Sequence, residues 1–218
     1  MPSDVLVEAL PVHLRLALSY APARVRALTL GLLVLDSRLA GIVRGTREPL
    51  LGQVRLAWWR DRLCEKPAAW PEGEPLLALL LLWGAETGTL SALVDGWEGL
   101  LGDPPLPGDA LERFADGRAS GFGGLARLLG GDPGEAMRAA RGWALVDLSG
   151  KLGDADERSA ARALAEQQDW RRVHLPRRLR PLAVLHGLAR RAMVRGEGEL
   201  LAGGTAGLVA LRLGLIGR

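Results

Sequence analysis

The sequence has few of the residues that favour β-strands. Only 5% of its 218 residues are aromatic, and seven of these ten residues are tryptophan. β-branched residues are also scarce, while leucine, alanine and arginine dominate. This composition favours helices over strands.

Cysteine and histidine are too sparse for a disulfide framework or a zinc site. Cys64 is the single cysteine, which excludes a disulfide within these 218 residues and suits a reducing compartment. The three histidines, His13, His174 and His186, are isolated in sequence, so no cluster with metal-ligand spacing exists. We therefore expect no metal site from the sequence pattern alone.

Long hydrophobic runs are absent as well. The longest, Pro75–Ala85, is too short to span a bilayer and is expected to be a buried helix. The first residues lack the basic start and unbroken apolar core of a signal peptide. The expected location is the cytoplasm, with peripheral contact to an inner membrane left open.

Glycine, proline and capping residues divide the chain into helical blocks. Asp109 and Asp132 are expected N-caps, and the block from residue 75 is expected to bend at Gly84 or Gly88. No linker is long enough to separate two domains. The prediction is one all-α domain, 1–218, of roughly eight helices. The expected blocks are 12–21, 23–45, 49–65, 75–101, 110–130, 134–152, 156–170, 179–195 and 206–216.

One of these blocks combines bulky apolar side chains with cations. On a helical wheel of about 100° per residue, its apolar residues separate into two stripes. The stripes are Leu56, Trp59 and Leu63 on one side, and Leu51, Val54 and Trp58 on the other. This pattern predicts a helix packed on two sides.

Arg55 and Arg62 lie between these stripes, whereas Arg60 lies on the remaining side. A guanidinium drawn inward needs an anionic partner, because burying an unpaired charge is costly. Two interpretations are open. The partners are the protein's own carboxylates, at Asp36, Asp95 or Glu98, or they are the phosphates of a ligand bound by Arg55, Arg62, Trp58 and Trp59.

The stretch Arg171–Arg195 contains eight arginines and no acidic residue. A solvated basic face and contact with an anionic membrane surface are both compatible with it. Nucleic acid is not expected as a partner, because the stretch offers no run of aromatic residues for base stacking and the formal net charge of the chain is only +3.

Several segments, in order, resemble the squalene/phytoene synthase family. The resemblance is strongest to its proteobacterial branch and to a mitochondrial relative that assembles respiratory complex I. It extends over roughly residues 12–195. The segments are LVLDSRLAGIVRGTREP (33–49), TREPLLGQVRLAWWRDRL (46–63), SALVDGWEGLL (91–101), FADGRASGFGGLARLLG (114–130), GWALVDL (142–148) and DWRRVHLP (169–176).

This resemblance implies an all-α isoprenoid synthase-like fold with a central cavity. Active members of the family join two prenyl diphosphates head to head. In them, two aspartate pairs at i and i+4 face each other and hold Mg²⁺, which stabilises the departing diphosphate. The resemblance also implies a protein partner in respiratory-complex assembly, or a prenyl lipid or diphosphate ligand.

The sequence departs from the family where the metal would bind. Asp36 is followed four residues later by Ala40, and Asp147 is followed by Lys151, a spacing typical of a helix salt bridge. The pair Asp95 and Glu98 offers further carboxylates, which we expect to form salt bridges with the arginines of residues 51–63.

Three hypotheses follow from the sequence. The leading one is a non-catalytic squalene/phytoene synthase-like protein that acts in assembly or as a scaffold and needs no cofactor. The second is an active Mg²⁺-dependent prenyltransferase with a remodelled site made of Asp36, Asp95, Glu98 and Asp147. The third is a prenyl-lipid or diphosphate binder without turnover.

Overall fold

The computed structural model describes residues 2–217 and is built of helices, with no β-strand in that range. The all-α prediction is therefore confirmed, while the ends of the predicted domain, Met1 and Arg218, lie outside the described residues. The α-helices are α1 (Pro2–Glu8), α2 (Val12–Ser19), α3 (Arg26–Gly45), α4 (Pro49–Cys64), α5 (Pro75–Leu80), α6 (Ser91–Glu98), α7 (Ala110–Leu128), α8 (Pro133–Ser149), α9 (Ala155–Glu166), α10 (Arg180–Arg195) and α11 (Ala206–Leu215).

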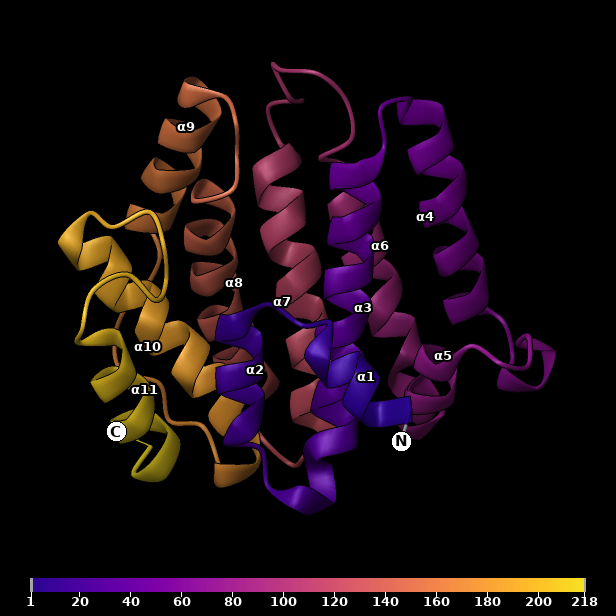
Figure 1. Cartoon of the computed structure of the whole chain (residues 1–218), viewed down its shortest axis with the longest axis horizontal. Coiled ribbons are helices and arrows are strands. Elements are labelled where there is room, and N and C mark those ends of the chain that lie inside the picture. The colour runs from indigo at the N-terminus through magenta and orange to yellow at the C-terminus, as the bar shows by residue number, and fades with distance from the viewer. Residues whose placement is uncertain (1, 218) are drawn as a thin grey trace.

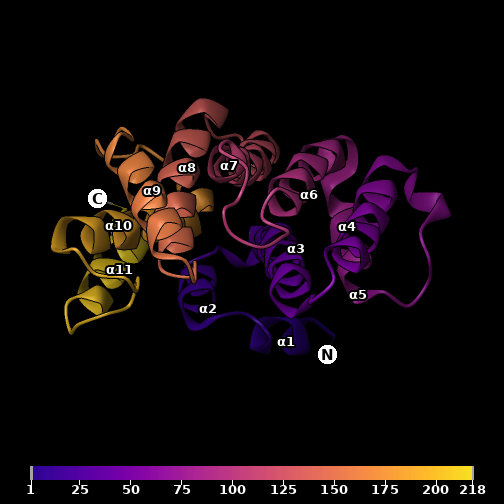
Figure 2. The same cartoon turned by 90° about the horizontal axis from the view of Figure 1, so that it is seen from above.

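The longer helices form a bundle around α7 (Figure 1). Helix α7 packs most extensively against α8 and α6, and α10 packs against the other side of α8. Helix α4 lies at one edge of the bundle and α9–α11 at the opposite edge, whereas α1 and α2 cover one face (Figure 2). The fully buried side chains of Trp83, Phe114 and Trp143 belong to one hydrophobic core.

Close contact between α6 and α7 depends on glycine. A Cβ atom added to Gly117 would overlap the carbonyl oxygen of Ala92, and one added to Gly96 would lie 2.9 Å from the carbonyl oxygen of Arg113. These neighbours are backbone atoms, which cannot rotate away as a side chain would. The two glycines therefore fix how closely the helices approach on this side of the core.

The starts of α7, α8 and α9 lie within one residue of the predicted positions, but only the predicted cap of α8 forms. Asp132 caps α8 by accepting hydrogen bonds from the amides of Gly134 and Glu135, at 2.8 and 3.2 Å. Asp109 makes no such bond at the start of α7. Asp154, which the sequence placed in a loop, instead caps α9 through the amides at positions 156 and 157.

The predicted helix 75–101 is interrupted. Gly84 has φ 50° and ψ −122°, so the expected bend occurs there, and the 3₁₀ segment Leu81–Leu90 separates α5 from α6. The helix α1 was not predicted, which together with this break raises the helix number above the expected eight.

The segment Pro75–Glu98 also bears on the membrane. Its 24 residues are long and apolar enough to cross a bilayer, although buried core helices meet the same criteria. The apolar run Pro75–Ala85 alone is shorter, which is why the sequence predicted no membrane span. In the structure, the backbone at Gly84 is not helical within this segment.

Candidate functional site

Two aspartates from different helices converge on one arginine in the centre of the bundle. Asp36 on α3, Asp147 on α8 and Arg118 on α7 are all buried. The Nε and Nη2 atoms of Arg118 donate to Oδ1 and Oδ2 of Asp36, at 3.0 and 2.8 Å. Its Nη1 atom donates to Oδ2 of Asp147, at 2.7 Å. Arg118 therefore bridges the two carboxylates with three hydrogen bonds.

Each of the two carboxylates accepts a hydrogen bond from one further donor. The indole Nε1 of Trp97 donates to Oδ1 of Asp36 at 2.8 Å, and Nζ of Lys151 donates to Oδ2 of Asp147 at 2.7 Å. We call Asp36, Trp97, Arg118, Asp147 and Lys151 the Arg118 cluster. The expected salt bridge between Asp147 and Lys151 is confirmed, but it is one part of a larger buried network.

Aromatic rings enclose the guanidinium of Arg118. Its central carbon lies 4.4 Å from the ring centroid of Trp143, 4.7 Å from that of Phe114 and 5.4 Å from that of Trp97. Rings at these distances attract a cation through their negative faces. The cluster thus pairs the charge of Arg118 and gives each of its three side-chain nitrogens an acceptor at a buried position.

The electrostatics favour a structural network in which every charge has a partner. Burial alone would raise the pKa of Asp147, but the charges of Arg118 and Lys151 hold it well below its usual range. Burial would likewise lower the pKa of Arg118, and the two aspartates raise it instead. His13, whose Nε2 lies 3.5 Å from Asp147, has a pKa lowered by burial. Two cations therefore balance two carboxylates.

The Arg118 cluster does not fit the Mg²⁺ centre that the resemblance implies. Mg²⁺ requires oxygen ligands in octahedral geometry, and a guanidinium cannot supply one. Both oxygen atoms of Asp36 and Oδ2 of Asp147 already accept hydrogen bonds from nitrogen donors. Nowhere in residues 2–217 do three or more His, Cys, Asp or Glu side chains form a group that could hold a metal.

The other two candidate carboxylates lie away from this centre, at the surface between α4 and α6. Arg60 binds both, with its Nε 2.6 Å from Oδ1 of Asp95 and with Nη2 bonded to Glu98. The side chain of Asp95 is 58% exposed. The expected salt bridges to an arginine of residues 51–63 are confirmed, although the arginine is the one that the wheel placed on the outer side.

Arg55 and Arg62 do not form the predicted salt bridges with Asp36, Asp95 or Glu98. Arg62 binds Glu65, the residue directly after its own helix, at 2.6 Å and lies over the ring of Trp58, 5.8 Å from the centroid. Arg55 is exposed. That interpretation is wrong because only one of the two apolar stripes of α4 faces the core.

The second stripe of α4 lies on the surface. Leu51 is 51% exposed, Val54 is 61% exposed and Trp58 is 40% exposed, whereas Trp59 is buried. The two tryptophans touch edge to face, 4.9 Å apart, but one belongs to the core and the other to the surface. The predicted ligand-binding residues therefore do not surround one enclosed cavity.

Sequence reasoning missed Arg118, the residue on which the centre is built. A signal was present, because Arg118 lies four residues after Phe114 and four before Phe122, on the apolar face of a predicted helix. A lone arginine at such a position needs buried carboxylates nearby. The two aspartates that stand alone in the pattern, Asp36 and Asp147, are those carboxylates.

Comparison of the chain with protein-family models, with curated proteins and with solved structures found no match. The resemblance to the squalene/phytoene synthase family stays a prediction from the residues.

Proposed function

We propose that this protein is a non-catalytic, squalene/phytoene synthase-like helical protein that acts as an assembly or scaffold protein or binds a prenyl lipid. The observation that carries the proposal is the position of Arg118 between Asp36 and Asp147. A positive charge held by the protein stands where the family resemblance would require a metal ion between facing carboxylates.

Replacing the guanidinium of Arg118 with a metal ion would cost free energy. A Mg²⁺ ion could bind only if the guanidinium left its carboxylate and aromatic partners and found others. Removing one partner from a buried ion pair costs about 3–5 kcal/mol, because a charge remains without compensation. The ion would also have to shed water that it releases reluctantly. The cluster therefore supports a structural role for the two aspartates.

Diphosphate release tests this proposal directly. The purified protein would be incubated with Mg²⁺ and farnesyl or geranylgeranyl diphosphate, next to a sample without protein and next to Asp36→Asn. Circular dichroism would establish that each protein is helical. We expect no release above the sample without protein. Release at an enzymatic rate that is lost in Asp36→Asn would overturn the proposal.

One observation favours the alternative, an active prenyltransferase with a remodelled site. Asp36 and Asp147 do converge from two helices on a single cation, as metal-binding carboxylates would. Asp95 and Glu98, which this alternative also needs, bind Arg60 at the surface instead. If the alternative holds, Asp36→Ala abolishes diphosphate release in the same assay.

The surface of α4 supports a binding role. Leu51, Val54 and Trp58 form an exposed apolar stripe, and Arg55 and Arg62 lie beside it. Such a surface suits a protein partner or the prenyl chain and diphosphate of a lipid. Titration with a non-hydrolysable prenyl diphosphate distinguishes the two. Saturable binding that weakens in Arg55→Gln/Arg62→Gln supports the lipid, and no binding at high micromolar concentration removes it and leaves the scaffold.

A further inference from the structure

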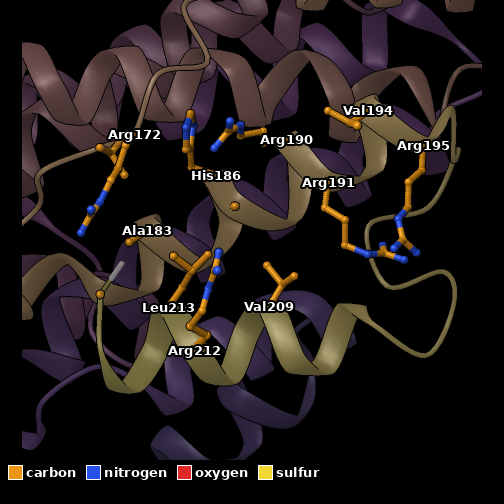
Figure 3. Close-up of a pocket in the computed structure, with 13 residues that line it drawn as sticks. Arg172, Ala183, His186, Arg190, Arg191, Val194, Arg195, Val209, Arg212 and Leu213 are labelled. Carbon is orange, nitrogen blue, oxygen red and sulfur yellow. The ribbon is translucent and has the colours of Figure 1, made fainter.

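A cluster of arginines, separate from the Arg118 cluster, lines a cavity of about 310 Å³ between α10 and α11 (Figure 3). Its volume lies within the usual range for small-ligand sites. Five arginines contribute to its lining, together with apolar side chains and no acidic residue. The arginines are Arg172, Arg190, Arg191, Arg195 and Arg212.

Two of these arginines already contact groups of the protein itself. Arg191 is buried, binds both carboxylate oxygens of Glu197 at 2.7 and 3.1 Å, and donates to the carbonyl oxygen of Ala202 and to Oγ1 of Thr205. Arg195 lies 4.0 Å from the same glutamate. Glu197 therefore offsets one of the two positive charges at this end of the cavity.

The other three arginines have no carboxylate partner of this kind. Among residues 2–217, the guanidinium groups of Arg172, Arg190 and Arg212 have no hydrogen-bond or ion-pair partner. They come from three places in the chain, the loop before α10, α10 itself and α11, and Figure 3 shows them around the same gap. All three side chains are exposed, so water solvates their charges and leaves them available to an anion.

The rest of the lining is apolar. Val209 and Leu213 rise from α11 toward the gap, Ala183 lies below it, and Val194 stands at its edge with 77% of its surface exposed (Figure 3). A Cβ atom on Gly187 would overlap the side chain of Leu213, so glycine makes room for this leucine beneath the arginines. Arginines that can bind an anionic head group thus lie directly beside a surface suited to an alkyl chain.

We propose that this cavity binds a phosphate monoester that carries an alkyl or acyl chain. The phosphate lies among Arg172, Arg190 and Arg212, where planar guanidinium groups offer paired N–H donors to its oxygens. The chain lies against Val209 and Leu213 and leaves past Val194. This site is separate from the Arg118 cluster, so the inference stands whether or not the proposed function is correct.

His186 forms a neutral part of the same wall. It is buried, its Nδ1 lies 3.3 Å from the carbonyl oxygen of Ala139, and its ring stacks on Trp170. Burial lowers the pKa of His186 to about 4, and the nearby Arg190 acts in the same direction. Attraction for the phosphate therefore comes from the arginines and persists at neutral pH.

The lining argues against nucleic acid. No Phe, Tyr or Trp borders the cavity, so it has no ring on which a base could stack.

The test uses dodecyl phosphate below its micelle concentration, measured by isothermal titration calorimetry with the full chain. We expect saturable binding, and a loss of at least tenfold in affinity in Arg190→Gln/Arg212→Gln. The matched control is Arg24→Gln/Arg44→Gln, which removes two charges from exposed arginines that do not line the cavity and should bind as the parent does. No saturable binding, or an equal loss in the control variant, would overturn the proposal.

Two further ligands separate the head group from the chain. Inorganic phosphate should bind more weakly than dodecyl phosphate, and neutral dodecyl maltoside should not compete. Val209→Thr should weaken dodecyl phosphate and leave inorganic phosphate unchanged. Equal binding of inorganic phosphate, or competition by the maltoside, would contradict a site for an amphiphile.

Vesicles identify the source of the ligand. If the source is a membrane, vesicles that contain phosphatidic acid sediment the parent and the control variant but not Arg190→Gln/Arg212→Gln. If dodecyl phosphate binds while no protein sediments, the ligand is a soluble phosphate monoester. A short oligonucleotide that binds where dodecyl phosphate does not would refute the proposal.

Discussion

Arg118 and Asp36 face each other through two parallel hydrogen bonds of 3.0 and 2.8 Å, although 82 residues separate them in the chain. This is the geometry in which the planar fork of a guanidinium matches a carboxylate. The contact joins α7 to α3 at the centre of the bundle, and Asp147 extends it to α8. The Arg118 cluster thus ties together three helices that also share the hydrophobic core.

Replacing Arg118 alone should destabilise the protein severely. Arg118→Met keeps much of the side-chain volume but leaves two buried carboxylates without their shared cation, at a cost of about 3–5 kcal/mol in the free energy of unfolding. Urea denaturation followed by circular dichroism measures this loss. The variant Asp36→Asn/Arg118→Met/Asp147→Asn should recover part of it, because the uncompensated charges are gone. A single variant as stable as the parent would contradict the structural role of Arg118.

A surface ion pair on the same bundle should behave differently. Asp95→Asn removes one of two carboxylates that bind Arg60, and its side chain is largely solvated. The expected loss in the free energy of unfolding is below about 1 kcal/mol, the usual range for exposed pairs. The measurement is the same urea titration at low and high salt, since salt screens exposed pairs. A loss comparable to that of Arg118→Met would mean that Asp95 supports the core.

The helices that the sequence predicted well are those with clear boundaries and one apolar face. The caps of α8, with Asp132 and Pro133, mark its start, and Gly196 marks the end of α10. The segment from residue 75 was harder, because its first nine residues, 75–83, are all apolar and its break at Gly84 depends on a single positive φ angle. Periodicity carries no information where every position is apolar.

The Arg118 cluster could be predicted only in part, for a related reason. Asp36 and Asp147 were singled out because they lie where the family resemblance places metal-binding aspartates. Lys151 was correctly expected to pair with Asp147, but the partner of Asp36 was sought among the arginines of α4. Partner choice depends on how α3, α7 and α8 pack, which local spacing does not reveal. The wheel of α4 erred in the same way, since Val54 and Trp58 have the spacing of a buried stripe and yet lie at the edge of the bundle.

The close approach of α6 and α7 provides a test of packing. Gly117→Ala should cost about 1–3 kcal/mol in the free energy of unfolding, because its methyl group would meet the backbone of Ala92. Gly41→Ala on α3 is the matched control, since its added methyl group meets nothing within 4 Å. That control should instead stabilise by about 0.4–1 kcal/mol through lower entropy of the unfolded chain. Stabilisation by both variants in chemical denaturation would show that the helices can move apart freely.

His186 should make stability depend on pH in a defined window. Its pKa is about 4 in the folded protein and 6.5 in its ordinary state, so the unfolded chain takes up a proton first as the pH falls. The contribution of neutral His186 to the free energy of unfolding is therefore fully present above pH 6.5. It is lost as the pH falls toward 4, by about 3 kcal/mol for a shift of this size. Asp147 does not contribute in this window, because its lowered pKa affects stability only below about pH 4.

The measurement is the free energy of unfolding in urea between pH 7 and pH 4, for the parent and for His186→Phe. The phenyl ring keeps the contact with Trp170 but cannot bind a proton, so the variant should be less stable at pH 7 and should lose less stability on acidification. A smaller slope should remain from His13, whose pKa burial also lowers. If both proteins lose the same amount between pH 6.5 and pH 4, His186 is not held neutral by its burial.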